Sequence, residues 1–129
     1  MLDWEPLIEH ALAQRQRAYA PYSGYRVGAA LSTRDGRVFT GCNVENRTYG
    51  LTICAERVAL VRAIAEGATE LEAIVVATAS SPPGTPCGQC RDSLAEFATE
   101  LPILLVNADG ERLEYDLAEL LPHPFKLDG

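Results

Sequence analysis

Three cysteines are spaced so that they can hold a catalytic metal ion, and one glutamate lies close to them in the sequence. Glu56 follows Cys54 by two residues, and Cys87 and Cys90 form a Cys-x-x-Cys pair further along the chain. Three thiolates can bind zinc and leave its fourth position open for water, which is typical of a catalytic rather than a structural zinc. A carboxylate beside that water is placed to carry protons. These four residues therefore predict a zinc site that handles a proton.

Other interpretations of the cysteines have to be weighed against this one. Cys42 would complete a closed structural zinc site, but it stands alone in an expected strand, without a Cys-x-x-Cys partner. Cys87-Gly88-Gln89-Cys90 also has the spacing of a thiol–disulfide pair, and by itself it leaves metal and redox roles open. Cys54 and Glu56 favour the metal, because a redox pair has no use for a third thiol beside a carboxylate. Four unrelated core cysteines are disfavoured by the Pro/Gly-rich sequence around Cys87.

Two arginines next to the cysteines suggest how the charge of the site is balanced. Zinc with three thiolates carries a formal charge of −1, which weakens its effect on bound water. Hydrogen bonds to the sulfurs from Arg57 or Arg91 would withdraw part of that charge. Both arginines would otherwise face solvent, and Arg57 is the better candidate for this supporting role.

Composition limits the classes of function. The chain has 129 residues, and we expect one domain, 1–129. Its net charge of −7 argues against a nucleic acid polymer as partner and suits a small, weakly charged substrate. No apolar run approaches the roughly 18 residues of a membrane span, and the acidic N-terminus is unlike a secretory signal. We therefore expect a cytoplasmic protein with free thiols and no membrane partner.

The first part of the chain predicts a helix followed by a β-hairpin. The helix, with Asp3 as its N-cap, is expected to end near Ala20-Pro21. Its apolar residues fall at helical spacing: Leu7, Ile8, Ala11, Leu12 and Tyr19. Two β-prone runs, 25–33 and 37–44, flank Asp35-Gly36, and Asp-Gly between such runs is a strong hairpin signal.

The rest of the chain predicts helices alternating with buried strands. A helix over 54–66 should end at Gly67 and bury Val58, Val61, Ile64 and Ala65. A second helix over 88–99 should turn Leu94 and Phe97 inward. The apolar runs 74–77 and 103–106 are typical of strands buried on both faces, and a short capped helix is expected over 116–120. This order predicts an α/β fold of three layers (α/β/α), with a mixed sheet of about five strands covered by helices on both faces.

Both cysteine segments are expected at helix N-termini. Cys54 begins one helix and Cys87 another. The free N–H groups and partial positive charge at a helix N-terminus lower the pKa of a thiol and favour the thiolate. Two helices that start toward the same point can therefore gather three zinc ligands.

With these residues in view, the chain resembles small zinc-dependent cytidine deaminases of the homotetrameric type. Cys-Ala-Glu followed by Pro-Cys-x-x-Cys is the known zinc pattern of nucleobase deaminases. The resemblance covers nearly the whole chain in ordered blocks: Ala20 to Ser23, Val27 to Leu31, Gly41 to Asn46, Tyr49 to Thr52, Cys54 to Arg57, Pro86 to Arg91, and Leu120 to Pro122 with Phe125.

The resemblance implies roles for further residues. Asn43 and Glu45 match positions that hydrogen-bond the ribose hydroxyls, and the backbone of Ala55 matches a contact to the base carbonyl. Tyr25 stands where the family usually has a phenylalanine that stacks on the pyrimidine. Its aromatic face remains, and its hydroxyl needs a partner if it is buried.

The resemblance also implies a homotetramer in which each site is shared between subunits. Tyr49 and Phe125 match positions that reach into a neighbouring subunit's site. Two departures from the family lie nearby: Arg47 replaces a usually small residue, and Asp92 replaces a usual glutamine and adds negative charge near the metal. His10 and His123 match no functional position and are expected at the surface.

The implied reaction is zinc-dependent hydrolytic removal of the 4-amino group of cytidine or deoxycytidine, with release of ammonia, in pyrimidine salvage. One zinc ion per subunit is implied, with Glu56 as the proton carrier. A deaminase of a cytosine antibiotic such as blasticidin S is the alternative within enzymes, although the ribose-type block 43–46 and Tyr22-Ser23 favour cytidine. A thiol–disulfide protein or a zinc-stabilised binding module is the alternative from another class.

Overall fold

A five-stranded mixed sheet forms the centre of the molecule. The computed structural model describes residues 2–127. Along the sheet the strands lie in the order β2 (Val38–Cys42), β1 (Gly28–Thr33), β3 (Leu71–Ala77), β4 (Pro102–Val106) and β5 (Arg112–Asp116). The β3–β4 pair is parallel and the other pairs are antiparallel. The predicted mixed sheet of about five strands is confirmed.

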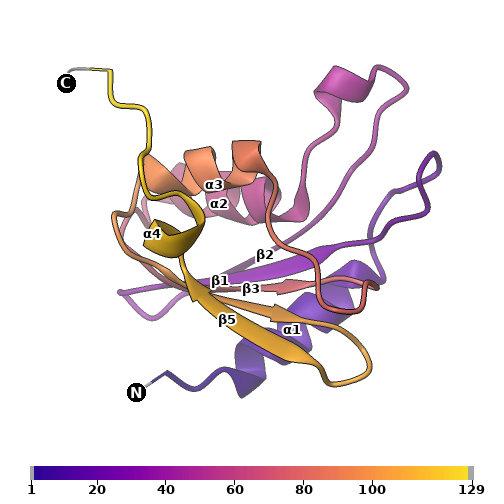
Figure 1. Cartoon of the computed structure of the whole chain (residues 1–129), viewed down its shortest axis with the longest axis horizontal. Coiled ribbons are helices and arrows are strands. Elements are labelled where there is room, and N and C mark those ends of the chain that lie inside the picture. Colours follow the sequence, from indigo (N-terminus) through magenta and orange to yellow (C-terminus); the bar gives the residue numbers. More distant parts are fainter. Residues whose placement is uncertain (1, 128–129) are drawn as a thin grey trace.

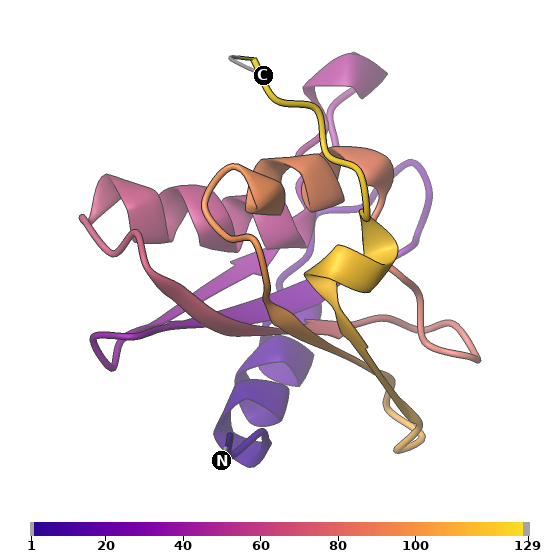
Figure 2. The ribbon, with the colours of Figure 1, turned by 60° about the vertical axis from the view of Figure 1, so that its left-hand side comes forward.

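Helices cover both faces of this sheet, as predicted. Helix α1 (Glu5–Arg15) packs on one face, against β1, β2 and β3. On the other face, α2 (Ala55–Ala65) and α3 (Gly88–Ala95) lie side by side, and the short α4 (Leu117–Leu120) packs against α3 and β5. Figures 1 and 2 show α1 on one side of the sheet and α2 and α3 together on the other. Across residues 2–127, none of the helices has the length and apolar character needed to cross a bilayer.

The central strands are buried on both faces, and their residues divide between two cores. In β3, Ile74 and Val76 belong to the core that includes residues of α2 and α3, whereas Val75 and Ala77 belong to the core beneath α1. Alternate side chains of a strand point to opposite faces, so a strand covered on both sides needs apolar residues throughout. This explains the continuous apolar runs in β3 and β4.

The predicted β-hairpin is present, with strands shorter than expected. Gly36 has a φ of +89°, a backbone conformation that glycine adopts without steric cost, and it forms the turn between β1 and β2. The backbone N–H of Thr33 donates to the carbonyl of Arg37 across that turn. Residues 25–27, which were expected in the first strand, lie before it, and two of them, Tyr25 and Val27, line the pocket described below.

Helix α1 ends at Arg15, so the prediction of a helix reaching Ala20-Pro21 is wrong. Tyr19, expected on its apolar side, lies outside the helix and is 56% exposed. Its backbone forms an isolated bridge instead. The N–H of Tyr19 donates to the carbonyl of Asn43, and the N–H of Glu45 donates to the carbonyl of Tyr19. These tertiary backbone hydrogen bonds take the place of another helical turn.

The predicted buried side of helix α2 is wrong for Val61 and Ala65, whereas Ile64 packs against the core and Val58 is half-buried. Val61 is 58% exposed and Ala65 is exposed, whereas the buried side carries small residues such as Ala59 and Ala63. The reason is the close approach of α2 to β2 over Gly41. A Cβ atom at Gly41 would lie 2.5 Å from the carbonyl oxygen of Ala55. Such an approach favours small residues such as Ala55 and Ala59 at the contact, where the Cβ atom of Val58 also lies 2.9 Å from the same position.

The second half of the chain differs from the prediction in detail. Helix α3 ends at Ala95 rather than Thr99, and Phe97 is 38% exposed, so its expected inward position is wrong; Leu94 is fully buried as predicted. Strand β5 was not predicted as a strand and pairs with β4. The predicted cap of α4 is confirmed as a capping box, in which Asp116 accepts from Ala118 and Glu119 accepts from the N–H of Asp116.

The contact between β2 and α2 gives a test of this packing. We expect Gly41→Ala to lower the free energy of unfolding by about 1–3 kcal/mol, the usual cost of overpacking, because its Cβ would also lie 2.7 Å from the backbone nitrogen of Ala59. Denaturant unfolding followed by circular dichroism measures the change. Gly50→Ala is the matched control, since no heavy atom lies within 4 Å of a Cβ there. Equal stability of the two variants would contradict the packing argument.

Candidate metal centre and pocket

The three cysteines predicted as metal ligands come together at the N-termini of α2 and α3. Cys54 is the N-cap residue of α2, Cys87 is that of α3, and Cys90 lies in the first turn of α3. Their Sγ atoms all lie within 4.8 Å of one another; Cys54 and Cys87 are 3.8 Å apart, and Cys87 and Cys90 are 3.5 Å apart. Tetrahedral zinc with bonds of about 2.3 Å places two sulfur ligands about 3.8 Å apart. The cluster therefore fits one zinc ion.

The surroundings of the cluster favour thiolates. Neither Cys54 nor Cys87 makes a side-chain hydrogen bond that caps its helix, so the positive ends of both helices face the sulfurs. A hydrogen bond from Cys90 and, beyond it, from Arg57 lowers the pKa of Cys54 to about 5. The same hydrogen bond to Cys54, together with burial and the nearby Glu56, raises the pKa of Cys90. Without metal, one thiolate is thus held by a neighbouring thiol, and zinc binding would release the remaining protons.

Glu56 lies next to this cluster in the first turn of α2 and is only 5% exposed. Burial raises the pKa of its carboxyl group to about 7, with a smaller contribution in the same direction from the charge on Cys54. Its own backbone N–H and the charge on Arg57 oppose the shift. A carboxyl group with a pKa near 7 can both accept and donate a proton at neutral pH, as a general acid–base residue must.

Most of the predicted site residues line one cavity of about 170 Å³. Glu56, two of the cysteines, Asn43, Ala55 and Tyr25 were all named from the sequence. The cavity is lined by Tyr25, Val27, Asn43, Cys54, Ala55, Glu56, Val76, Thr78, Thr85 and Cys87. The ribose and base contacts predicted for Asn43, Ala55 and Tyr25 therefore point to a single space beside the sulfur cluster.

Asn43 and Glu45 hold the segment that forms one wall of this cavity. The Asn43 side chain accepts from the N–H of Val27 at 2.9 Å and donates to the carbonyl of Tyr25 at 2.8 Å. Glu45 is buried behind the wall, where it accepts from the backbone N–H groups of Tyr22 and Ser23 and from the Ser23 hydroxyl. These bonds lower the pKa of Glu45, the Ser23 hydroxyl being the largest cause. Glu45 does not line the cavity in this chain, and its contact to ribose stays a prediction.

The two arginines have different positions. Arg57 places its Nη2 atom 3.8 Å from the Cys54 sulfur and 3.3 Å from the carbonyl oxygen of Thr52, as the supporting role predicted for it requires. Arg91 bonds to backbone carbonyls instead of to the sulfurs. Its Nε donates to the carbonyl of Pro86 and its Nη1 to the carbonyl of Leu120, so it fastens the start of the α3 segment to the end of α4.

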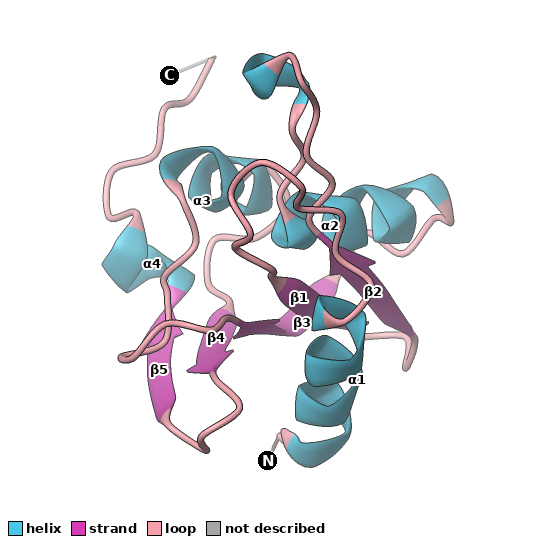
Figure 3. Cartoon of the chain, turned by 90° about the vertical axis from the view of Figure 1, so that its right-hand side faces the viewer, coloured by secondary structure: helices cyan, strands magenta, loops and turns pink. Residues whose placement is uncertain are grey.

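Tyr49 and Phe125 lie away from the cavity of their own chain. Tyr49 begins the short 3₁₀ helix η1 (Tyr49–Leu51) and is 69% exposed, with its ring edge-on to Tyr22 at 6.5 Å. Phe125 is 78% exposed in the C-terminal segment. Figure 3 shows η1 and the C-terminal segment extending beyond the layers of the fold. Neither aromatic ring contributes to the site within one chain.

The residues that depart from the family pattern, and the two histidines, lie at the surface. Arg47, His10 and His123 are exposed, which confirms the surface position expected for the histidines. Asp92 is also exposed, and it lines a surface hollow together with Arg57 and Phe125.

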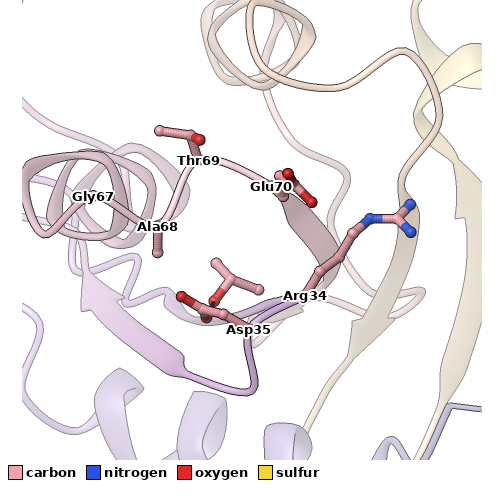
Figure 4. Close-up of a pocket in the computed structure, with 7 residues that line it drawn as sticks. Arg34, Asp35, Gly67, Ala68, Thr69 and Glu70 are labelled. Atoms are coloured by element: carbon pink, nitrogen blue, oxygen red, sulfur yellow. Dashed lines mark hydrogen bonds between the residues drawn. The ribbon is translucent and has the colours of Figure 1, made fainter.

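A second hollow, of about 300 Å³, lies at the other end of α2 (Figure 4). It is bounded by the hairpin turn at Asp35 and by Gly67 to Glu70, which follow the helix. An 11-residue helix is about 16 Å long, so the sulfur cluster is far from this hollow. Hydrogen bonds from Arg37 and Thr33 occupy the Asp35 carboxylate and lower its pKa to about 2. The Asp35 carboxylate is thus already paired, and Arg34 extends away from the hollow in Figure 4.

Sequence reasoning missed part of the cavity wall. Thr78 and Thr85 line the cavity, and Ser80 is hydrogen-bonded to Thr78. Thr78 directly follows the buried strand β3, so the change from apolar to polar residues at that strand end was an available signal. Ser80 and Thr85 lie in an irregular loop, and no periodicity marked them.

Comparisons with known proteins agree with this geometry. Residues 2–105 match the family model described as the cytidine and deoxycytidylate deaminase zinc-binding region. A cytidine deaminase of Sporosarcina psychrophila is 42% identical over 96% of this chain and 92% of its own length. The crystal structure of a cytidine deaminase from Burkholderia pseudomallei has a TM-score of 0.92 and 46% identity, covering 96% of this chain and 100% of that one. A cytidine deaminase structure from Mycobacterium tuberculosis has a TM-score of 0.84 and 38% identity, over 98% and 100%.

The raised pKa of Glu56 predicts a pH-dependent effect on stability in the metal-free protein. Below about pH 4.5 the carboxyl group is protonated in both the folded and unfolded states, so it contributes nothing. As the pH rises from 4.5 to 7, only the unfolded state loses its proton, and the folded state loses stability relative to it. Chelator-treated Glu56→Gln should therefore be more stable than chelator-treated wild type at pH 8, by at most about 3 kcal/mol, and equal to it near pH 4. Denaturant unfolding at both pH values measures this, and a pH-independent difference would contradict a buried, titrating Glu56.

Proposed function

The chain belongs to the cytidine and deoxycytidylate deaminase zinc-binding family, and from this membership and the site we infer that it catalyses zinc-dependent hydrolytic deamination of cytidine and deoxycytidine. Water replaces the 4-amino group, which gives uridine or deoxyuridine and ammonia. One observation carries the inference: three cysteine sulfurs with the spacing of zinc ligands lie beside a buried glutamate at a common cavity.

Cys54, Cys87 and Cys90 are the residues we propose as zinc ligands. All three ionise on metal binding, and the helix N-termini at Cys54 and Cys87 lower the cost of doing so. When bound, zinc supplies a Lewis acid that makes water acidic enough to attack the base at neutral pH. Three protein ligands leave room for that water.

Glu56 is the proposed proton carrier. It takes a proton from the attacking water and passes it to ring N3 as the oxygen adds to C4. It then takes the second proton from the new C4 hydroxyl and passes it to the amine, so that the C4–N bond breaks, ammonia leaves and the C4 carbonyl forms. One carboxyl group can serve as base and then as acid because these transfers follow one another. Its burial and its pKa of about 7 suit both the ionised carboxylate that acts as base and the protonated carboxyl that acts as acid.

The nucleoside contacts are proposals supported by position. Ala55 is the first residue of α2, so its N–H has no partner within the helix and is free to donate to the base carbonyl. Tyr25 offers its ring to the base and Asn43 its amide to ribose, since both line the cavity. Glu45 would reach a ribose hydroxyl only through the part of its carboxylate that Tyr22 and Ser23 leave available.

Arg57 is the proposed partner of the sulfurs. Its guanidinium is within 3.8 Å of the Cys54 sulfur, and its Nε is buried without a hydrogen-bond partner among residues 2–127. A positive charge held there would offset the −1 charge of zinc with three thiolates and so keep the attacking water acidic.

We also propose a homotetramer with sites shared between subunits. The cavity of one chain is about 170 Å³, below the roughly 300–1,000 Å³ of ordinary small-molecule sites. Large apolar side chains are exposed in the segments that extend from the fold, among them Tyr49, Leu51 and Phe125. Closure of each cavity by aromatic residues of a neighbour would account for both facts.

Further proposals concern the biological setting. The net charge of −7 favours a free nucleoside over a nucleic acid polymer, and a free nucleoside needs no base flipping. We place the enzyme in the cytoplasm, where thiols stay reduced, acting as one domain in pyrimidine salvage and without a membrane partner.

The proton-carrier role predicts a large loss of activity from a minimal change. Glu56→Gln should retain one zinc ion per chain and lose at least about 10²-fold in kcat, since proton transfer typically contributes 10²–10⁴-fold. Loss of cytidine absorbance near 280 nm measures turnover, and metal analysis measures zinc. Glu66→Gln makes the same chemical change at the other end of α2 and should keep full turnover.

The outcome that would contradict this role is more than about a tenth of wild-type turnover in Glu56→Gln. The ligand set is checked in the same experiment. Cys87→Ser should lose zinc, whereas Cys42→Ser should keep it, because Cys42 lies outside the sulfur cluster.

The shared site predicts that two inactive variants restore activity to each other. Phe125→Ala should remove an aromatic ring that each subunit lends to its neighbour, and Glu56→Gln should remove the proton carrier. In mixed tetramers, a site with an intact Glu56 can receive Phe125 from a Glu56→Gln subunit. Co-refolding the two variants should therefore give turnover above the sum of the separate proteins, with mass measured by light scattering. A monomer, or no gain on mixing, would overturn the shared site.

A further inference from the structure

The hydroxyl of Tyr25 is held by the loop that leads to Cys87. The Tyr25 oxygen lies 2.8 Å from Ser80 Oγ, and Ser80 Oγ lies 3.0 Å from Thr78 Oγ1. Thr78 Oγ1 in turn accepts from the N–H of Gly84 at 2.9 Å. These contacts form a chain of hydrogen bonds from Tyr25 across the loop of residues 78–86, which ends one residue before a sulfur of the metal cluster.

Gly84 lies in close contact with the groups that form this chain of hydrogen bonds. A Cβ atom at Gly84 would lie 2.6 Å from the Tyr25 hydroxyl oxygen, 3.1 Å from Ser80 Oγ and 3.4 Å from Thr78 Cγ2. An alanine at position 84 would therefore require the Tyr25 hydroxyl to shift from its position. The side of the loop that faces Tyr25 is closely fitted to the extra oxygen.

The backbone of Tyr25 is fixed from the opposite side. Its carbonyl accepts from the Asn43 side chain at 2.8 Å, and its N–H donates to Ser23 Oγ at 3.0 Å. The Ser23 hydroxyl donates to Glu45. The main chain of Tyr25 thus contacts Asn43 directly and Glu45 through Ser23, which are the two residues proposed to bind ribose. Its side chain contacts the loop before Cys87.

We propose that Tyr25 is a positioning residue whose hydroxyl joins the loop before Cys87 to the nucleoside-binding wall held by Asn43. This inference rests on the proposed function for the identity of the nucleoside. The hydroxyl is engaged by Ser80, so it acts on the reaction by fixing the cavity wall on which Tyr25, Thr78 and Thr85 all lie.

The expected kinetic effect of losing this link follows from its position. Without it, the wall is less well held when the nucleoside enters, and binding weakens in the ground state and the transition state alike. A loss of uniform binding raises KM and leaves kcat nearly unchanged. Cys87 would still be held by zinc, so the metal content should not change.

The test compares zinc-loaded wild type with Tyr25→Phe, Ser80→Ala and the double variant, using amide hydrogen exchange and cytidine kinetics. Tyr25→Phe keeps the ring and removes only the hydroxyl. Exchange of the loop amides from Ala79 to Thr85 should become about threefold to tenfold faster, the range expected for one lost hydrogen bond. KM should rise by a similar factor, with kcat within about twofold. The double variant should match Ser80→Ala, because both changes break the same link.

Tyr19→Phe is the matched control, since Tyr19 is an exposed tyrosine outside the cavity, and its exchange and kinetics should equal those of wild type. Unchanged loop exchange in Tyr25→Phe, or additive effects in the double variant, would overturn the link. Faster exchange with an unchanged KM would overturn its role in the reaction. If wild type failed to convert cytidine, the proposed function would fall, whereas the exchange comparison needs no substrate and would still decide whether the link exists.

Discussion

The site depends on two helix N-termini meeting at the same edge of the sheet, and the chain path makes this meeting unavoidable. Helix α2 leads through Gly67 into β3, so it runs back along the sheet and its N-terminus lies near the end of β3. Helix α3 connects β3 to its parallel neighbour β4, so it must begin after that same strand end. Cys54 and Cys87 are the N-cap residues of these two helices. The topology therefore gathers the sulfurs before any metal is bound.

This meeting creates an electrostatic conflict that the neighbouring residues reduce. Burial is the main cause of the raised pKa of Glu56, and the hydrogen bond with Cys54 is the main cause for Cys90; repulsion by the charge on Cys54 adds a smaller contribution to both. Two helix N-termini and Arg57 supply the opposing positive charge. The conflict has a use, because a glutamate that ionises near pH 7 can carry protons and one that stays ionised cannot. The same burial that weakens the folded protein equips Glu56 for its proposed role.

The sequence was sufficient for features that depend on local chemistry. The clustering of the three cysteines, the place of Glu56 beside them, the Asp35-Gly36 hairpin and the buried strands β3 and β4 were all predicted, because spacing, turn residues and apolar runs act within a few residues. The buried side of α2 was predicted only in part, with Val61 and Ala65 wrong, since it depends on Gly41 of a different element and on how closely the two backbones approach. The predicted end of α1 was wrong for a similar reason, because the backbone of Tyr19 pairs with the backbone at residues 43–45. Tyr49 and Phe125 could be assigned only by resemblance, because one chain gives them no partner in its own cavity.

Tyr25 shows why a single departure from a family pattern cannot be judged by itself. Tyr25 is 42% exposed, so solvent can also satisfy its hydroxyl, and the bond to Ser80 fixes the direction of that hydroxyl rather than offsetting a cost of burial. Here Ser80 supplies the partner, and Gly84 supplies the space, because any side chain at that position would meet the new oxygen. The three residues are far apart in the sequence and form one unit in space. A larger residue at position 84 would require the hydroxyl to shift, whereas phenylalanine at position 25 would remove that contact and leave the Ser80 hydroxyl bonded only to Thr78. The side chain at position 25 thus decides which residues the loop before Cys87 can accept.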